Sequence, residues 1–203
     1  MRSLIVKTLF MSLANSHIHP SAIVDEGAQV GEGTYIWHFC HLMPKSKVGR
    51  NCILGQNVFI DNDVVLGNGV KVQNNVSVYK GVVIEDDVFL GPSMVFTNVI
   101  NPRSFIERKD EFRKTIIRKG ATLGANSTIL CGVEIGSYAM IGAGAMVVGN
   151  VSPYGLVVGN PARQIGWVSE AGITLDFTAD GVAACPVTGR RYKLMNQMVF
   201  PVS

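Results

Sequence analysis

Polar side chains that could do chemistry recur at multiples of six residues in the first half of the chain: His38, Gln56, Asn74 and Asn98. A histidine can accept a proton near neutral pH, so His38 is a candidate general base. An amide does not usefully accept a proton, but its oxygen and NH2 group can hold and orient a polar substrate group. Asn98 stands out among the amides because it lies where the spacing breaks down. Stacked amides can also serve only to form the corners of a repeat.

The stretch that follows Asn98, VINPRSFIERKDEFRKTI, is rich in charge. From Val99 to Lys119 the chain has seven basic and three acidic residues, a local charge of +4, while the whole chain has a net charge of +3. A guanidinium group can bind a carboxylate or a phosphate through two parallel hydrogen bonds. We therefore predict an anion-binding loop, with Arg103 as the first candidate and Arg108 as the second. The alternative is a charged loop that only faces solvent.

A six-residue repeat carries these side chains. Aliphatic residues occur at every sixth position from Ile18 to Leu90, Phe96 follows, and the spacing returns from Ile117 to Val147. Three positions after the aliphatic residue, fourteen of nineteen repeats carry Gly, Asn or Asp, which tolerate a positive φ or a tight corner. Each repeat predicts a short strand and a turn. Three repeats then predict an 18-residue triangular coil of a parallel β-helix, an all-β fold.

Residues 18 apart should lie above one another in such a coil, so the sequence also predicts columns of corner side chains. One corner stacks His38, Gln56, Asn74 and Pro92 and continues, after 15 extra residues in the interruption, with Ala125 and Ala143. A second corner carries Asn98. The third carries charged side chains and indicates a solvated face. Small residues at the late corners would let another molecule approach the backbone.

Length and composition predict one domain in three parts. Residues 1–17 are predicted to be an N-terminal extension, 18–152 the β-helix with an inserted loop at about 99–116, and 153–203 a C-terminal cap and tail. The net charge of +3 requires no nucleic-acid partner, and no apolar run approaches the length of a membrane span. The four cysteines lack metal-ligand spacing and disulfide-framework density, which favours reduced thiols in the cytoplasm.

Several longer motifs resemble one bacterial family. VQNNVSVY and FTNVINPRSFIERK, together with LGQNVFIDNDV and GNPARQIGW, are similar to the UDP-2-acetamido-3-amino-2,3-dideoxy-glucuronate N-acetyltransferases of lipopolysaccharide O-antigen synthesis. The resemblance covers roughly residues 17–200. The first two motifs are more specific than the repeats, which many hexapeptide acyltransferases share. The extension before His17 and the coil LMPKSK depart from the family pattern.

The resemblance implies a left-handed β-helix, a homotrimer with active sites between neighbouring prisms, acetyl-CoA as the donor and a UDP-linked amino sugar as the acceptor. Asn98 would then orient the acceptor amine, and Arg103 or Arg108 would bind the uronate carboxylate. The expected substrate contacts also include four side chains of the coils: Gln56, Asn74, Asn75 and Tyr79. The expected acetyl-CoA contacts come from late positions: Ala125, Ala143 and Arg163. No metal is required.

Three alternatives remain open. His38 or His41 could act as general base, but His38 lies a little over three coils from Asn98, about 16 Å at the usual strand spacing, and would be better placed to contact the nucleotide. A zinc-dependent carbonic anhydrase would need three histidines that meet, whereas only His38 and His41 lie within the predicted coils proper. The protein could also acetylate another nucleotide-linked amino sugar or be a non-catalytic scaffold, which would not bind acetyl-CoA.

Overall fold

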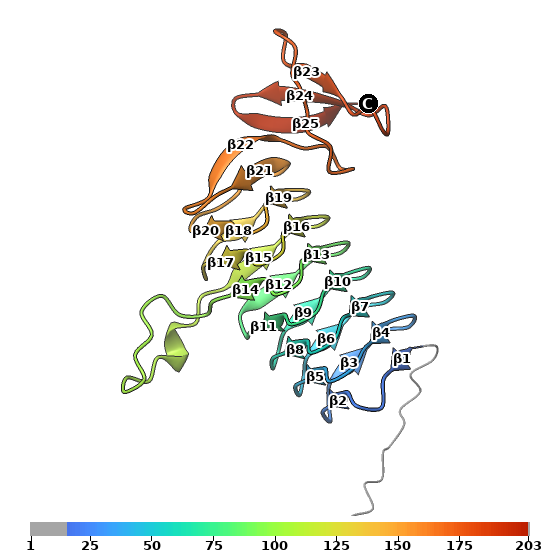
Figure 1. The fold of residues 1–203 in the computed structure, drawn as a ribbon, viewed down its shortest axis with the longest axis vertical. Coiled ribbons are helices and arrows are strands. Elements are labelled where there is room, and N and C mark those ends of the chain that lie inside the picture. The colour runs from blue at the N-terminus through green and yellow to red at the C-terminus, as the bar shows by residue number, and fades with distance from the viewer. Residues whose placement is uncertain (1–15, 203) are drawn as a thin grey trace, which may run out of the picture.

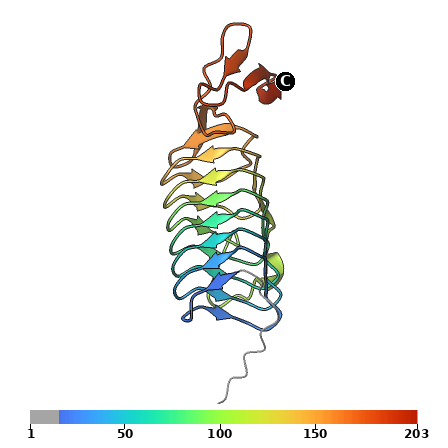
Figure 2. The same ribbon diagram turned by 90° about the vertical axis from the view of Figure 1, so that its right-hand side faces the viewer.

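The computed structural model describes residues 16–202. The chain winds as an all-β, left-handed parallel β-helix, a triangular prism with three flat faces that we name A, B and C (Figures 1 and 2). This confirms the fold class that the repeat predicts. The predicted N-terminal extension lies outside the described residues except for Ser16 and His17.

Each face is a sheet of very short strands that stack in chain order. Face A contains β1 (His17–Ile18), β4 (Tyr35–Ile36), β7 (Ile53–Leu54), β10 (Lys71–Val72), β13 (Phe89–Leu90), β16 (Thr122–Leu123), β19 (Met140–Ile141), β21 (Gly155–Val158) and β22 (Arg163–Trp167). Face B contains β2 (Ile23–Val24), β5 (His41–Leu42), β8 (Phe59–Ile60), β11 (Ser77–Val78), β14 (Val95–Phe96), β17 (Thr128–Ile129) and β20 (Met146–Val147). Face C contains β3 (Gln29–Val30), β6 (Lys47–Val48), β9 (Val65–Leu66), β12 (Val82–Ile84), β15 (Thr115–Ile117) and β18 (Glu134–Ile135).

The register between coils reproduces the spacing of the sequence. Phe89 pairs with Lys71 in the coil before it and with Thr122 in the coil after it. The step from Lys71 to Phe89 is the regular length of one coil, whereas the step from Phe89 to Thr122 is longer by the length of the interruption. The interruption therefore adds chain at one corner and leaves the stacking of the three faces unchanged.

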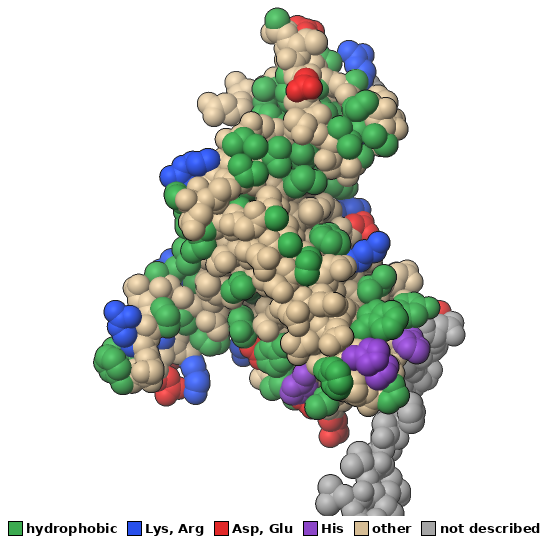
Figure 3. All heavy atoms as spheres, viewed as in Figure 1, with side chains coloured by type: hydrophobic (Ala, Val, Ile, Leu, Met, Phe, Trp, Pro, Cys, Tyr) green, Lys and Arg blue, Asp and Glu red, His purple; other side chains and the backbone are tan. Residues whose placement is uncertain are grey.

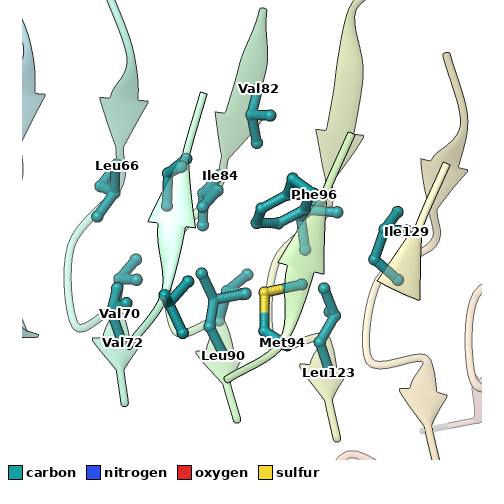
Figure 4. Packing of buried hydrophobic residues seen from close by; sticks show 14 of the residues in the cluster. Leu66, Val70, Val72, Val82, Ile84, Leu90, Met94, Phe96, Leu123 and Ile129 are labelled. Carbon is teal, nitrogen blue, oxygen red and sulfur yellow. The ribbon is translucent and has the colours of Figure 1, made fainter. Parts of the chain in front are cut away.

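The inward side chains form one core along the prism. From Ile36 onward the second residue of almost every two-residue strand is buried, and Figure 4 shows how these side chains interlock between coils. Phe96, the one aromatic residue in the aliphatic series, lies in the coil from which the interruption departs. It is 1% exposed and packs near Met94 of the same coil and Leu123 of the next. Close packing of this kind fixes the height and direction of each corner.

The corners require left-handed backbone, as the recurring Gly, Asn and Asp indicate. Asn57 and Asn75 have φ of 59° and 61°, values that asparagine adopts more readily than most residues. Phe39 and Lys45 occupy equivalent corners with φ of 58° and 62°, where a larger side chain is strained. The corner geometry is therefore imposed by the stacked strands and does not depend on one residue type.

Two segments depart from the prism. Residues 97–114, between β14 and β15, form a projecting loop that contains the 3-10 turn η1 (Lys109–Glu111) (Figure 1). At the other end β22 runs antiparallel to β21, and β23 (Val182–Ala184), β24 (Arg191–Met195) and β25 (Met198–Val202) form a separate antiparallel sheet over a second apolar cluster. Across residues 16–202 no helix is long and apolar enough to cross a membrane.

Candidate active site

Asn98 lies at the root of the projecting loop, and backbone hydrogen bonds close that root. The Arg113 N–H donates to the Asn98 carbonyl oxygen over 3.2 Å, so the two chains of the loop meet there. Beside it the Cys131 N–H donates to Thr97 Oγ1 over 2.9 Å. The Arg113 side chain runs over Gly132, where an added Cβ would come within 3.1 Å of Arg113 Cδ. These contacts hold Asn98 at a fixed height on the prism.

The loop pairs much of its own charge. Arg108 Nη1 donates to Glu111 over 2.6 Å, and Lys109 contacts Glu107 over 2.9 Å, which raises the pKa of Lys109. Arg103, in contrast, donates only to the carbonyl oxygen of Pro102, over 3.1 Å, and is exposed. Arg103 is therefore the candidate whose guanidinium is accessible to a substrate anion, whereas Arg108 would have to leave Glu111.

Two basic residues counted with the loop in the sequence belong to the prism. Arg118 lies between Glu134 and Glu85, with hydrogen bonds of 2.8 Å and 2.7 Å. These bonds raise the pKa of Arg118 far above its ordinary value, and Arg118 lowers the pKa of Glu134. Lys119 lies 3.9 Å from Asp87. The loop thus carries less of the positive charge than the sequence indicates.

The amides at the A-to-B corner, where the chain passes from face A to face B, are partly structural. Asn74 Oδ1 accepts a hydrogen bond from the Gln56 backbone N–H over 2.8 Å, and Asn57 donates to Asn75 Oδ1 over 3.1 Å in the neighbouring coil. Gly55 permits the first contact, because a Cβ there would lie 2.5 Å from Asn74 Oδ1. Asn75 thus takes part in the stack of corner amides that the sequence left open as a structural role. Asn74 uses only its oxygen in this way, so its NH2 group remains available to a ligand.

A hollow of about 280 Å³ lies beside this corner, and Trp37, His38, Gln56, Gln73 and Asn74 contribute to its lining. His38 stacks on His19 with a ring separation of 3.5 Å. Burial, then the neighbouring His38 and His17, lowers the pKa of His19. Figure 3 shows the histidines at the N-terminal end of the prism beside exposed hydrophobic side chains. In residues 16–202 no group of three or more His, Cys, Asp or Glu side chains is arranged to hold a metal ion.

The candidate residues form two groups within one chain. His38, Gln56 and Asn74 lie at the A-to-B corner, because each follows a strand of face A. Asn98 follows β14 at the B-to-C corner, where the loop with Arg103 and Arg108 also begins, and Tyr79 follows β11 at the same corner one coil earlier. The width of face B therefore separates the two groups.

Backbone donors at the A-to-B corner are mostly open. Asn74 caps the Gln56 N–H, but in the described part of the chain the N–H groups of His38, Asn74, Ala125 and Ala143 have no hydrogen-bond acceptor. At Ala125 and Ala143 the side chains are also small and leave the backbone uncovered. These open donors lie where another molecule could reach them. Arg163, the first residue of β22, donates to the Ala162 carbonyl oxygen over 2.9 Å and is exposed.

Sequence reasoning missed three residues of the hollow and its surroundings. His19 and Trp37 occupy the same position in successive coils, directly after an aliphatic residue, and Gln73 follows Val72 in the same way. The predicted corner columns use the next position along. Extending the columns to this neighbouring position would have placed all three beside His38 and Asn74.

Known proteins share both the repeat and most of the chain. The family model described as bacterial transferase hexapeptide (six repeats) matches residues 27–62 and 114–149, and the hexapeptide repeat of succinyl-transferase matches 47–80. The dTDP-3-amino-3,6-dideoxy-alpha-D-galactopyranose 3-N-acetyltransferase of Aneurinibacillus thermoaerophilus is 45% identical over 182 residues, which cover 90% of this chain and 93% of that enzyme.

Solved structures show the same fold at lower identity. The acetyltransferase domain of PglB from Neisseria gonorrhoeae FA1090, in complex with acetyl coenzyme A, has a TM-score of 0.53 at 20% identity and covers 74% of this chain and 57% of that one. The acetyltransferase VCA0836 of Vibrio cholerae O1 biovar eltor, complexed with acetyl coenzyme A, has a TM-score of 0.52 at 24% identity, covering 58% and 68%. With the repeat, the prism and a relative that matches over nearly its full length, the chain belongs to the hexapeptide-repeat acetyltransferases.

Proposed function

We propose that the protein transfers the acetyl group of acetyl-CoA to the 3-amino group of a UDP-linked 2-acetamido-3-amino uronic acid, a sugar of O-antigen synthesis. The similarity to an enzyme that acetylates a nucleotide-linked 3-amino sugar carries the proposal for the reaction. The motifs VQNNVSVY and FTNVINPRSFIERK support the uronate. The relative's acceptor is a 6-deoxy sugar and has no carboxylate at C6. The proposed uronate differs at this position, so the loop must supply the group that binds the carboxylate. The four buried free cysteines agree with a cytoplasmic enzyme.

In the proposed reaction the neutral amine attacks the thioester carbonyl of acetyl-CoA. Asn98 Oδ1 accepts a hydrogen bond from the amine and aims its lone pair at the carbonyl carbon. A C–N bond forms, the carbonyl oxygen becomes an oxyanion, and a backbone N–H at a late corner stabilises that charge. The C–S bond then breaks, the thiolate of CoA leaves, and the amine proton passes to solvent or to the departing sulfur. A sugar amine is sufficiently weakly basic to be partly neutral near pH 7, so no strong base is needed.

The two groups of site residues suggest that the working enzyme is a homotrimer. If face B of each prism faces a threefold axis, the B-to-C corner of one chain lies against the A-to-B corner of the next, and Asn98 then lies in the same groove as the partner's A-to-B corner, above the hollow. Face B suits a shared interior, because its outward side chains include no Lys, Arg, Asp or Glu: Ile23, His41, Phe59, Ser77, Val95, Thr128 and Met146. Faces A and C would stay in solvent; the outward side chains of their parallel strands include Lys71 on face A and Lys47 and Glu134 on face C.

Val95→Lys is expected to break this trimer. Val95 is 46% exposed in one chain, and three lysines near one axis would repel each other. Light scattering should show a trimer for the wild type and smaller species for the variant, with loss of activity. Val65→Lys is the matched control, because Val65 is 41% exposed on face C. A wild-type monomer at micromolar concentration, or a trimeric and active Val95→Lys enzyme, would contradict the arrangement.

Arg103→Ala is expected to remove the preference for the uronate. A charge-assisted pair is worth about 1.5 to 3 kcal/mol, so the wild type should prefer the 3-amino uronate over its neutral 6-hydroxymethyl counterpart by about 10- to 150-fold in kcat/KM. CoA thiol release with the two acceptors measures this ratio and tests the proposed reaction directly. The variant should lose most of the preference while the KM for acetyl-CoA stays nearly constant.

Lys109→Ala is the matched control for Arg103, since it removes one positive charge from the same loop at a side chain already paired with Glu107. Arg108→Ala should have a smaller effect than Arg103→Ala because Glu111 holds its guanidinium. If the wild type used both acceptors equally well, the anion-binding hypothesis would be wrong, and the loop would be a charged segment that only faces solvent. Absence of thiol release with every nucleotide-linked amino sugar would refute the proposed function itself.

A further inference from the structure

The hollow at the A-to-B corner combines a flat aromatic wall with amides, and the proposed reaction does not use it. Trp37 is 44% exposed, and its ring lies nearly parallel to that of His38, with an interplanar angle of 9° and a centroid separation of 6.2 Å. The stack of His38 on His19, at 3.5 Å, fixes the plane of the His38 ring. Aromatic faces of this kind are the usual platforms for nucleobases.

Asn74 gives the hollow an amide whose orientation is fixed, so that its NH2 group can act only as a donor to a ligand. Its Oδ1 is occupied by the Gln56 backbone N–H at 2.8 Å, so its amide cannot flip without losing that bond. The NH2 group is therefore presented outward as a donor, and it selects an acceptor on the ligand. The Gln56 side chain is exposed and free to rotate, so it can serve as donor or acceptor.

The height of the hollow suits the far end of a nucleotide-linked sugar. Asn74 lies four repeats before Asn98, which places it one and one-third coils lower, and Gln56 and His38 lie one and two coils below Asn74. At about 4.8 Å per coil the hollow spans roughly 6 to 16 Å below Asn98 along the prism. A trimer axis parallel to the prism preserves these heights between neighbouring chains. A ribose and two phosphates can bridge this interval from a sugar amine held at Asn98.

We infer that the hollow binds the pyrimidine base of the acceptor, with Trp37 and His38 as the stacking wall and the Asn74 NH2 group as a fixed donor to the keto oxygen at C4. This inference rests on the proposed function for the identity of the rest of the ligand. Uracil and thymine carry a keto oxygen at C4, whereas cytosine carries an amino group there. A donor that cannot flip would face that amino group, donor against donor. With its donor facing C4, the site therefore selects 2,4-dioxopyrimidines over cytosine.

The test uses the full chain and free nucleoside diphosphates, with no sugar attached. The chain has two tryptophans, so Trp37 reports on the hollow and Trp167 does not. UDP should quench the emission of the wild type and of Trp167→Phe, while Trp37→Phe should show no quenching. Calorimetric titration should give UDP about 10-fold tighter binding than CDP. Absence of quenching in Trp167→Phe, or equal affinity for UDP, CDP and GDP, would overturn the inference.

Asn74→Asp tests whether the side chain at position 74 distinguishes uracil from cytosine, and a matched control accounts for the effect of an added negative charge. The aspartate keeps an oxygen for the Gln56 N–H but replaces the donor with an acceptor, which repels O4 of uracil and accepts the amino group of cytosine. The UDP-to-CDP affinity ratio should fall from about 10 to about 1 or below. Asn51→Asp is the matched control: it adds the same charge at a left-handed corner of the same coils, with φ of 55°, and should leave the ratio at its wild-type value.

The two proposals fail in distinguishable ways. Thiol release with a UDP-linked 3-amino sugar, together with an unchanged ratio in Asn74→Asp, would leave the reaction standing and refute the base site. Loss of uracil selectivity in Asn74→Asp without any acetyl transfer would leave the base site standing and refute the proposed reaction. The melting temperature of each variant shows whether the prism remains folded.

Discussion

Asn98→Ala is expected to lower kcat by about 100-fold and to raise the KM for the acceptor by much less. The hydrogen bond from the amine to Asn98 Oδ1 matters most as the amine approaches the thioester, because loss of aim at the reacting atoms costs about two orders of magnitude in rate. The Arg113 N–H to Asn98 carbonyl bond involves only the backbone and survives the substitution, so the root of the loop should stay closed. Steady-state kinetics with both substrates varied gives kcat and the two KM values separately.

His38→Ala decides between this assignment and a histidine base. On our assignment the variant should keep kcat within about threefold of the wild type, because His38 lies about 16 Å below Asn98 along the prism, and should mainly raise the KM for the acceptor. If Asn98→Ala remains active while His38→Ala loses its activity with the fold intact, the histidine is the general base. The pH profile adds a second reading, since a histidine base would produce an acidic limb that disappears in the alanine variant.

Ala143→Trp is expected to raise the KM for acetyl-CoA by at least about 10-fold with little change for the acceptor. The Ala125 and Ala143 N–H groups have no acceptor in the described part of the chain, and the small side chains at this corner leave the backbone uncovered. A large side chain would cover donors that the pantetheine arm could use. Ala143→Asn tests the cause more finely. By analogy with the Asn74 contact to the Gln56 N–H, it should cap the Ala125 N–H and raise the same KM without great bulk.

Ser137→Asn is the control for both substitutions at Ala143. Ser137 occupies the C-to-A corner in the coil directly before that of Ala143, away from the corner that carries the open donors. Its kinetics should match the wild type. Unchanged KM values in Ala143→Trp would place the donor elsewhere on the prism.

The prism could be predicted almost completely because its determinants are local and repeat. Residues such as Ile36 and Leu54 recur at a period that predicts the 18-residue coil, whereas its left-handed sense came from the resemblance to a known family. The extra chain of the interruption is visible in the sequence as a break in that period. The Gly, Asn and Asp corners were likewise predictable, because left-handed backbone favours few residue types. Phe39 and Lys45 show that the period outweighs corner preference where the two conflict.

The site was less predictable because its contacts depend on where individual side chains point, and the six-residue spacing carries no information on side-chain orientation. Nothing in the spacing shows that Glu111 holds Arg108 while Arg103 stays accessible, since both arginines lie in a loop without repeat. The column of amides was predicted, but the sequence does not show that Asn74 turns its oxygen inward to a backbone N–H and its NH2 group outward. The separation of Asn98 from the A-to-B corner follows from the triangular section, once each residue is assigned to the strand before it.

The unchanged register across residues 97–114 has a consequence for how specificity can diversify. Chain inserted at that corner rejoins the prism in phase, so the loop can lengthen, shorten or change composition while every coil after it keeps its neighbours. Each coil contacts chiefly the coils directly above and below, which confines the cost of such a change to one level of the stack. On the proposed assignment, the loop that recognises the acceptor's sugar ring and the late coils that bind the acyl donor are parts of one prism, and each can change in sequence without disturbing the other.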